Sequence, residues 1–484
     1  MKEIRKITVF ALMISVFTVG CEKKKDDKTL LYGAAALSAS RSTGTATSTA
    51  TGFTIGGTIS GLTTSGLVLQ NNGADDLTVA SGATTFTFTT KVTGAYAVTI
   101  KTQPSLAYCT LSSGSGTAAA NVTNISISCG SLMGGQILKL LSSLTAAVTV
   151  FAGPANGSTA SGSADGTGNA AGFNSPQGIT TDGTNLYVMD RFNYRIRKIV
   201  IATGAVTTLA GDGTSGDTDG TGTSARFAWA WGITTDGTNL YVADSFNSKI
   251  RKIVISTGVV TTIAGPAQGA TTSGDTDGTG NTARFNVPIA ITNDGVNLYI
   301  ADTNNNKIRK MVIATGAVTT LAGPAQGTTT SGDLDGTGNA ARFTNIKGIT
   351  TDGTNLYVSE QSIKKVRKIV IATGVVTVLA GPANGTTTAG DTDGTGNAAR
   401  FLSPFDMTTD GTNLYLSDDN KIRKIVIATG VVTTLAGPAQ GTTTSGDLDG
   451  TGNATRFNAP QGIITDGTSL YVVDNGNNKI RRIQ

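Results

Sequence analysis

The segment DGTNLYV at residues 182–188 returns five more times along the chain with few changes. Asp-Gly and Thr-Asn supply the positive-φ residues that a tight hairpin turn requires, so the recurrence is first a matter of turn chemistry. The tyrosines of the six copies recur every 54 to 58 residues and are Tyr187, Tyr241, Tyr299, Tyr357, Tyr415 and Tyr471. This even period indicates one repeated structural unit, and DGTNLYV is interpreted as six scaffold turns rather than six sites.

Each repeat contains four segments with strand character, which in the first repeat are QGITTDG, NLYVMD, RIRKIVIAT and AVTTLAG. A period of this length, rich in β-branched residues and turns, is typical of a propeller. The last repeat stops after three segments, at NNKIRRIQ, and residues 148–153 (VTVFAG) would supply the missing fourth. The sequence therefore predicts an all-β, six-bladed β-propeller over residues 147–484, closed by an N-terminal strand that completes the last blade.

The stretch FNSPQGITTDGTNLYVMDRFNYRIRKIV at residues 173–200 resembles the NHL repeat, and the resemblance extends over residues 147–484. It implies a β-propeller, usually with six blades. It does not imply one activity, because members include extracellular sensor domains, protein- and RNA-binding platforms and a lyase, and related propellers include lactonases.

Residues 1–20 have the form of an export signal: a basic head is followed by ITVFALMISVFTV, which is too short to span a bilayer. TVGC then resembles a bacterial lipobox, although Thr18 stands where Leu is commonest, and a plain signal peptide is the alternative. The resemblance implies that Cys21 is acylated and becomes the N-terminus. We expect residues 21–52 to be a flexible tether and the protein to be lipid-anchored to the bacterial cell envelope, at the outer membrane or the cell surface.

Residues 53–130 alternate short β-rich runs with Gly, Asn and Ser turns, which predicts a small β-sandwich. Cys109 and Cys129 are an even pair in an exported chain, and we expect a disulfide between them. The pattern GxISGLTxSGLVLQNNGxDDL resembles a module of bacterial surface proteins that serves as a stalk or spacer. Residues 131–146 are predicted to be a linker, with a short amphipathic helix that includes Ile137, Leu138, Leu141 and Leu144.

The composition argues against several classes of function. Histidine is absent, which removes the commonest general base and metal ligand, and the net charge is only +5 over 484 residues. No basic cluster interleaved with aromatic residues occurs beyond the IRK of each repeat, so we expect no nucleic-acid partner. No catalytic constellation is evident. We therefore expect a monomer without a cofactor that is not an enzyme.

The string GDTDGTGNAARF at residues 390–401, which recurs in other repeats, resembles a calcium loop because hard cations prefer oxygen ligands from a tight Gly-containing turn. It lacks the distal bidentate acid of an EF-hand. The favoured interpretation is structural: each Asp caps backbone N–H groups or pairs with the Arg of its own loop, such as Arg284. The weak calcium candidates are Asp275, Asp277, Asp391 and Asp393.

A second set of acids ends the second strand of each repeat, and we expect a local network between each acid, the Asn of the following loop and the IRK arginine. These acids are Asp190, Asp244, Asp302, Glu360, Asp418 and Asp474. A functional ring of acids is the alternative.

Function is better sought where the repeats differ. One position at the opening of the first strand varies among near-identical neighbours, and its residues are Gln177, Trp231, Ile289, Lys347, Phe405 and Gln461. Propeller geometry places all six around the mouth of the central channel. Phe192, Tyr194, Trp229 and Phe246 lie in adjacent loops. Aromatic residues at a concave rim suit binding, whereas neutral drift among recent duplicates is the alternative.

These observations favour a non-enzymatic surface or periplasmic protein whose rim binds a protein or a glycan. An enzyme of the lactonase or lyase type at the channel mouth and a purely structural repeat protein are the two alternatives.

Overall fold

The computed structural model describes residues 52–62, 65–102, 104, 107–133, 136–138, 141 and 144–484. The predicted signal peptide, the lipidation site Cys21 and almost all of the predicted tether lie outside these residues. The described part is all-β, with short 3-10 helices between the strands. No helix in these ranges is long and apolar enough to cross a membrane.

The N-terminal strands form two sheets. One has the order β4-β1-β8-β6, with β9 on β8, and the other has the order β3-β2-β5-β7. The strands are β1 (Ile55–Ser60), β2 (Val68–Asn71), β3 (Asp75–Thr78), β4 (Thr85–Thr87), β5 (Gly94–Thr102), β6 (Ala107–Ser112), β7 (Ser115–Ala118), β8 (Val122–Met133) and β9 (Gln136–Leu138). Buried side chains of both sheets, among them Ile55, Leu69 and Val98, share one core.

Two sequence predictions for this region have different outcomes. The disulfide between Cys109 and Cys129 is confirmed, and the two cysteines lie directly opposite each other on β6 and β8. The amphipathic helix predicted within residues 131–146 is wrong. Strand β8 continues to Met133, and β9 pairs with it in antiparallel register, so Ile137 and Leu138 lie in a strand. Backbone pairing with an existing strand determines this segment, and the helical spacing of its apolar residues does not.

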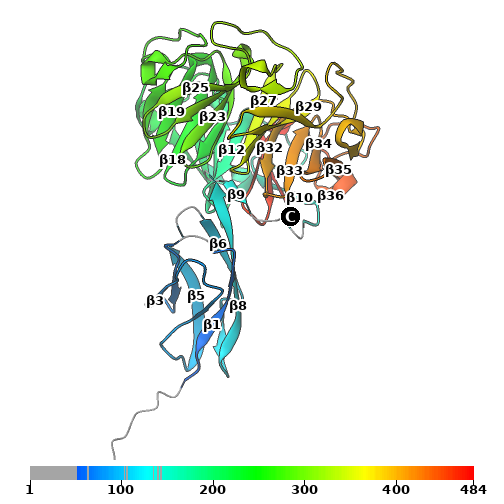
Figure 1. The fold of residues 1–484 in the computed structure, drawn as a ribbon. Helices are drawn as coiled ribbons and strands as arrows, with labels where there is room; N and C mark the ends of the chain where they lie inside the picture. The colour runs from blue at the N-terminus through cyan, green and yellow to red at the C-terminus, as the bar shows by residue number, and fades with distance from the viewer. Residues whose placement is uncertain are drawn as a thin grey trace, which may run out of the picture. The chain divides into compact units, whose positions relative to one another are not determined.

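The repeats form six five-stranded sheets of one design in the described part of the chain (Figure 1). In the order in which they pair, the strands are β11 (Gly166–Thr167), β15 (Ala205–Ala210), β14 (Arg195–Val200), β13 (Asn185–Asp190) and β12 (Pro176–Thr181); β16 (Gly220–Thr221), β20 (Val259–Ala264), β19 (Lys249–Val254), β18 (Asn239–Asp244) and β17 (Ile233–Thr235); β21 (Gly278–Thr279), β25 (Ala317–Ala322), β24 (Lys307–Val312), β23 (Asn297–Asp302) and β22 (Pro288–Asn293); β26 (Gly336–Thr337), β30 (Val375–Ala380), β29 (Lys365–Val370), β28 (Asn355–Glu360) and β27 (Ile346–Thr351); β31 (Gly394–Thr395), β35 (Val431–Ala436), β34 (Lys421–Val426), β33 (Asn413–Asp418) and β32 (Pro404–Thr409); and β36 (Gly450–Thr451), β10 (Ala147–Ala152), β39 (Lys479–Ile483), β38 (Leu470–Asp474) and β37 (Pro460–Thr465).

Short 3-10 helices connect these strands. Some follow the two-residue strands and others follow the second strand of a repeat. They are η1 (Gly168–Ala170), η2 (Arg191–Asn193), η3 (Gly222–Ser224), η4 (Ser245–Asn247), η5 (Gly280–Thr282), η6 (Thr303–Asn305), η7 (Gly338–Ala340), η8 (Gly396–Ala398), η9 (Gly452–Ala454) and η10 (Asn475–Asn477).

Each sheet contains one strand more than the four that the sequence predicts. The additional strand is the Gly-Thr pair of the GDxDGTG loop, which joins the outer edge of the sheet; in the first repeat, Gly166 pairs with Val206. In the last sheet, β10 occupies the position next to β39, with Val148 opposite Ile483. The segment at residues 148–153 therefore lies in the sheet of the last repeat, far from it in sequence.

Neighbouring sheets pack through apolar faces, and their first strands run side by side. Tyr187 and Met189 of β13, for example, share a buried cluster with Leu240 of β18 in the next sheet. A Cβ atom on Gly178 of β12 would lie 2.2 Å from the carbonyl oxygen of Trp231, and one on Gly462 of β37 would lie 2.3 Å from that of Gln177. The fold of the repeats is therefore propeller-like, with the first strands innermost.

Candidate functional site

The DGTN turns contain their own hydrogen-bond network. Gly237 has a φ of 87°, as the turn prediction requires. The Asp236 carboxylate accepts hydrogen bonds from the backbone N–H groups of Thr238 (2.8 Å) and Asn239 (2.6 Å), and the Tyr241 hydroxyl donates to it over 2.8 Å. Burial alone would raise the pKa of Asp236, but the hydrogen bonds from Asn239 and Tyr241 lower it. The side chains of Asp236, Asn239 and Tyr241 are thus all bonded within the turn, which supports its scaffold role.

Four of the six acids that end the second strands form the expected network with the loop Asn and the arginine, whereas Glu360 and Asp418 pair with the arginine without a loop Asn. Asp302, which is fully buried, pairs with Arg309 over 2.8 Å and accepts a hydrogen bond of 2.8 Å from the side-chain amide of Asn305. The Arg309 guanidinium also lies 5.3 Å from the centroid of the Phe285 ring. A buried charge with this many partners has a structural explanation, so these acids are not needed to account for a binding site.

For the Asp-x-Asp loops, the predicted capping of backbone N–H groups is confirmed, because Gly327 donates to Asp275 over 2.8 Å, but the predicted pairing with the loop arginine is wrong. Asp275 pairs with Lys307 over 2.6 Å and Asp277 pairs with Arg309 over 2.7 Å, both on the third strand of the repeat. The arginine of the same loop, Arg284, donates to the backbone carbonyls of Asn281 and Ala283 instead. The other two calcium candidates are paired in the same way, with 2.5 Å between Asp391 and Lys421 and 2.8 Å between Asp393 and Arg423.

In the first repeat, the residues at both positions of the Asp–Lys pair differ from those of the other repeats. Ser163 stands where the other repeats have the first Asp of the loop, and Arg195 stands where they have the paired Lys. The Arg195 guanidinium donates to the Ser163 carbonyl over 3.3 Å. The loop arginine is also replaced in this repeat, by Gly172, but the change that contacts Ser163 is Arg195 on the third strand.

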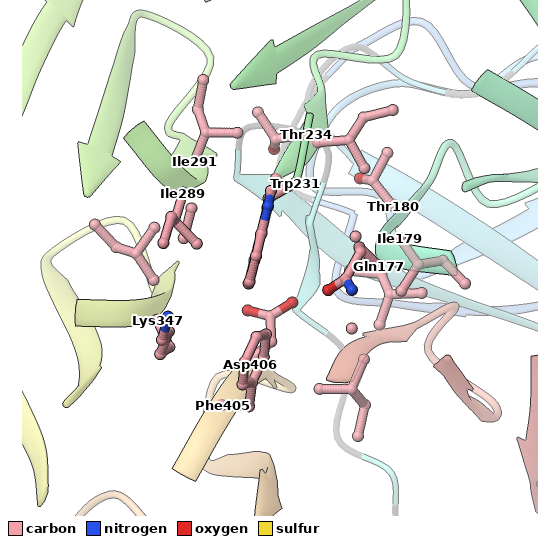
Figure 2. A pocket seen from close by; sticks show the side chains of 18 of the residues that line it. Gln177, Ile179, Thr180, Trp231, Thr234, Ile289, Ile291, Lys347, Phe405 and Asp406 are labelled. Atoms are coloured by element: carbon pink, nitrogen blue, oxygen red, sulfur yellow. The ribbon is translucent and has the colours of Figure 1, made fainter. Parts of the chain in front are cut away.

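A pocket lies where the first strands of the repeats begin (Figure 2). All six first strands, β12, β17, β22, β27, β32 and β37, contribute to its lining, and its empty volume is about 530 Å³ with the solvent at its mouth included. Five of the six variable positions line it, namely Gln177, Trp231, Ile289, Lys347 and Phe405. The sixth, Gln461, lines a neighbouring pocket that shares Phe405.

Two aromatic rings and a lysine dominate one side of this pocket. The Trp231 and Phe405 rings are inclined by only 18°, with centroids 5.8 Å apart. The Lys347 ammonium lies 5.0 Å from the Trp231 centroid and 5.8 Å from that of Phe405. Trp231 comes from the segment before β17, whereas Lys347 and Phe405 come from β27 and β32, so three separate repeats place this group.

A second aromatic cluster is joined to the first by Arg191, the first residue of η2. Its guanidinium lies 4.5 Å from the Trp231 ring and 4.8 Å from the Trp229 ring. Trp229 in turn packs against Phe192 (5.9 Å) and Phe246 (4.5 Å). Its indole N–H donates to the Tyr194 hydroxyl over 3.1 Å. The loop aromatics predicted from the sequence are therefore together, and Arg191, which the sequence analysis missed, connects them to the pocket.

The predicted rim residues include side chains that are exposed to solvent and side chains that are buried. Phe192 and Phe246 are 43% and 53% exposed, in agreement with an open rim. Gln177 and Ile289 are only 3% and 5% exposed, so the expectation of an exposed rim is wrong for these two. They form the wall of the pocket because their strands pack directly against the neighbouring first strands. The side-chain oxygen of Gln177 is buried there without a hydrogen-bond partner among the described residues.

Asp406 places a carboxyl group inside the same pocket, beside Phe405 (Figure 2). Four other repeats have glycine at this position. Gly348 on the adjacent strand makes room for it, because a Cβ there would lie 2.9 Å from an Asp406 carboxylate oxygen. Burial raises the pKa of Asp406 to about 7, although hydrogen bonds from the backbone N–H groups of Met407 and Ile463 oppose this shift.

Comparison with known proteins finds sequence similarity between these repeats and NHL-repeat proteins. No family model matches the chain. NHL repeat-containing protein 2 of Homo sapiens is 34% identical over 166 residues, which cover 31% of this chain and 22% of that protein. Protein SUPPRESSOR OF QUENCHING 1, chloroplastic, of Arabidopsis thaliana is 29% identical over 272 residues, which cover 53% of this chain and 25% of that protein. The match spans about a quarter of the length of these relatives, and it supports homology to NHL-repeat proteins.

Solved structures with the same fold come from Bacteroides. A structural-genomics protein of unknown function from Bacteroides thetaiotaomicron has a TM-score of 0.51 and 19% identity, with 86% of this chain and 90% of that chain covered. An auxiliary nutrient binding protein from the same organism has a TM-score of 0.50 and 16% identity over the same shares. At this identity the likeness concerns the fold alone.

Proposed function

We propose that this chain is a saccharide-binding protein of the bacterial cell envelope, and that it binds its ligand at the pocket formed by the first strands. The observation that carries the proposal is the convergence of variable positions. Trp231, Lys347 and Phe405 come from equivalent places in three repeats, and they meet in one group of two near-parallel rings and a cation. Aromatic planes with a nearby polar group suit the apolar face and the hydroxyls of a sugar. A protein ligand is the alternative occupant.

The proposal includes a closed ring of six blades over residues 147–484. The pairing of β10 with β39 supports it, as does the close approach of Gly462 on β37 to Gln177 on β12. A hydrogen bond of 2.7 Å from the Ser175 backbone N–H to the Asn478 side chain also joins the first and last repeats. In such a ring five blades contribute a variable residue to the axial pocket, and Gln461 of the sixth lines the neighbouring pocket.

The proposal also includes a lipid anchor on Cys21, a tether over residues 21–52, a spacer sandwich over 53–130 and a linker over 131–146. The lipobox-like TVGC motif supports the anchor. The variant Cys21→Ala is expected to leave the membrane fraction or to accumulate as the uncleaved precursor. Fractionation and mass spectrometry of the N-terminal peptide test this point, and an unmodified Cys21 peptide from membranes would contradict it.

An enzyme at the channel mouth is the second candidate, and Asp406 is the observation that favours it. A carboxyl group with a pKa of about 7 inside a pocket is suited to general acid–base chemistry. The described residues of this pocket provide no second carboxylate. The arrangement therefore fits binding better than a two-group acid–base mechanism.

A glycan array probed with the full chain tests the proposed function. The parent is expected to capture a defined set of saccharides, and the double variant Trp231→Ala, Phe405→Ala is expected to lose them. The control is Leu334→Ala, which removes an exposed apolar side chain outside both aromatic clusters and outside the pocket lining. Equal capture by the parent and the double variant would move the binding site away from this pocket.

A further inference from the structure

Two half-buried cations at the pocket lack the carboxylate partners that the fully buried cations of the repeats have. Lys307 and Arg309, for example, both pair with carboxylates. The Lys347 ammonium and the Arg191 guanidinium form no ion pair with any acid in the described ranges, and the Nε of Arg191 is buried without a hydrogen-bond partner. Burial and the charge of Arg191 lower the pKa of Lys347, and burial lowers that of Arg191.

These charges are not required by the repeat. Where the fourth repeat has Lys347, two others have glutamine, Gln177 and Gln461. Where the first repeat has Arg191, the others have Ser245, Thr303, Gln361, Asp419 and Asn475. The fold thus accepts neutral side chains at both positions. Lys347 lines the pocket and Arg191 lies beside it on the Trp231 ring. Two partly desolvated like charges this close are unfavourable in the free protein, so a bound anion would compensate them.

From this geometry we infer that the pocket selects acidic saccharides, in which a uronic-acid ring lies against Trp231 and Phe405 and its carboxylate accepts hydrogen bonds from Lys347 and Arg191. The inference rests on the proposed saccharide binding and names its substrate class. Both cations lie within 5.0 Å of the centroid of the Trp231 ring, so a sugar ring on this platform holds its carboxylate within their reach. Charge-assisted hydrogen bonds of this kind are stronger than those between neutral groups.

Asp406 adds a pH dependence to this selectivity. Lys347 is the other charged side chain in the pocket lining, because the residues contributed by β12, β17, β22 and β37 are uncharged, and Arg191 lies beside Trp231. With a pKa of about 7, Asp406 becomes protonated as the pH falls from 8 to 6 and then donates a hydrogen bond instead of repelling an anion. We expect acidic saccharides to bind more tightly at pH 6 than at pH 8.

Tryptophan fluorescence provides a direct assay, because Trp229 and Trp231 are the only two tryptophans of the chain and both lie at this site. The full chain is titrated with hexamers of galacturonate and of mannuronate, and with the methyl esters of the same hexamers. The esters keep the rings and remove the charge. At least one acid hexamer is expected to bind at least about tenfold more tightly than its ester, which corresponds to the loss of a charge-assisted hydrogen bond.

Substitutions by residues that occur at the same positions in other repeats show which side chain causes the difference in affinity between acid and ester. Lys347→Gln and Arg191→Gln are each expected to weaken binding of the acid hexamer by roughly tenfold and to leave binding of the ester unchanged. Lys347→Arg is expected to restore most of the affinity. Lys310→Gln, which removes a lysine of β24 outside the pocket lining, is the matched control and should behave as the parent.

The outcomes separate the inference from the proposed function. Equal affinity for acids and esters, unchanged by Lys347→Gln, would overturn acid selectivity while saccharide binding stands. No fluorescence change with any hexamer, together with an empty glycan array, would overturn both. Asp406→Asn should remove the difference between pH 6 and pH 8, and a pH dependence retained in that variant would exclude Asp406 as its source.

Discussion

The surroundings of the Lys347 ammonium group differ from those of the other lysines in its repeat. Because burial and Arg191 lower its pKa, the charged form is less favourable in the folded protein than in the unfolded chain. Lys347→Gln is therefore expected to leave the free energy of unfolding unchanged or to raise it by up to about 1 kcal/mol at pH 7, although binding of the acid hexamer is weakened. The matched control is Lys365→Gln, which removes the nearer of the two buried cations that pair with Asp333 and should cost about 3 kcal/mol. Urea denaturation measures both, and similar losses would make Lys347 a packing residue.

Asp406 predicts how stability changes with pH. Its folded pKa is about 7 and its ordinary value is 3.8, so between these values the folded chain holds a proton that the unfolded chain releases. The contribution of this side chain to stability therefore falls as the pH rises through this window. Asp406→Asn should increase the free energy of unfolding at pH 8 by about 1–3 kcal/mol and have little effect at pH 4. Thermal unfolding at both values tests this, and equal shifts at pH 4 and pH 8 would contradict it.

At the scale of residues, local networks could be predicted from the sequence and distant ones could not. The network of Asp302 with Asn305 and Arg309 lies within one strand–loop–strand unit, and the sequence places all three close together. The pairing of Asp275 with Lys307 joins residues 32 positions apart, and a nearer arginine was available in the loop. Arg191 alone is positively charged at its position among the repeats, but its contact with Trp231 joins two repeats, and no pattern within one repeat indicates it.

At the scale of elements, the turn glycines permit a direct test of the hairpin. Gly237 has a φ of 87° and no atom within 4 Å of an added Cβ, so Gly237→Val introduces backbone strain without a steric clash. We expect it to reduce the free energy of unfolding by about 1–3 kcal/mol, because a β-branched residue is poorly tolerated at positive φ. Thr238→Val, at the exposed neighbouring position, is the control and should change it by less than about 0.5 kcal/mol. If both changes reduced the free energy of unfolding equally, backbone strain at Gly237 would not be the cause of the loss.

The strands that the sequence predicts are those with a strong pattern of their own. In β13 and β14, runs such as NLYVMD and RIRKIV are apolar and β-branched, and both strands are present as predicted. The two-residue strand β11 has no such pattern, because Gly166 and Thr167 become a strand only by pairing with β15. The same holds for β9, whose pairing with β8 overrides a helical spacing. The secondary structure of a short segment depends on the strand with which it pairs, and the sequence of the segment itself does not contain that information.

At the scale of the whole molecule, the repeat period predicts which residues meet at the pocket but not how deeply each is buried. Six equivalent positions must converge if the first strands are innermost, and five of them line one pocket. Their burial depends on neighbours from other repeats. Gly348 leaves space for Asp406, whereas Gln177 is enclosed by the close approach of Gly462. These contacts join residues that are tens to hundreds of positions apart, so no pattern within one repeat encodes them.

The strand β10 allows the proposed ring closure to be tested on the whole molecule. Deleting residues 146–153 removes the partner of β39 and exposes the backbone N–H and C=O groups on that edge. Exposed sheet edges pair with other chains, so the deleted protein is expected to aggregate or to melt at a lower temperature. The five other sheets obtain this strand from the segment that follows an Ala-Thr-Gly or Ser-Thr-Gly turn in their own repeat.

A rescue variant follows from that difference. Appending Ile-Ala-Thr-Gly and residues 147–153 after Gln484 restores the pairing through a hairpin of the same length as in the other repeats, and is expected to recover a monomer with nearly the parental melting temperature. Size-exclusion chromatography and thermal unfolding compare the parent, the deletion and the rescue. A deletion that stays monomeric and melts like the parent would show that β10 does not close the ring. Rescue by a scrambled strand would show that added length, and not pairing with β39, restores the fold.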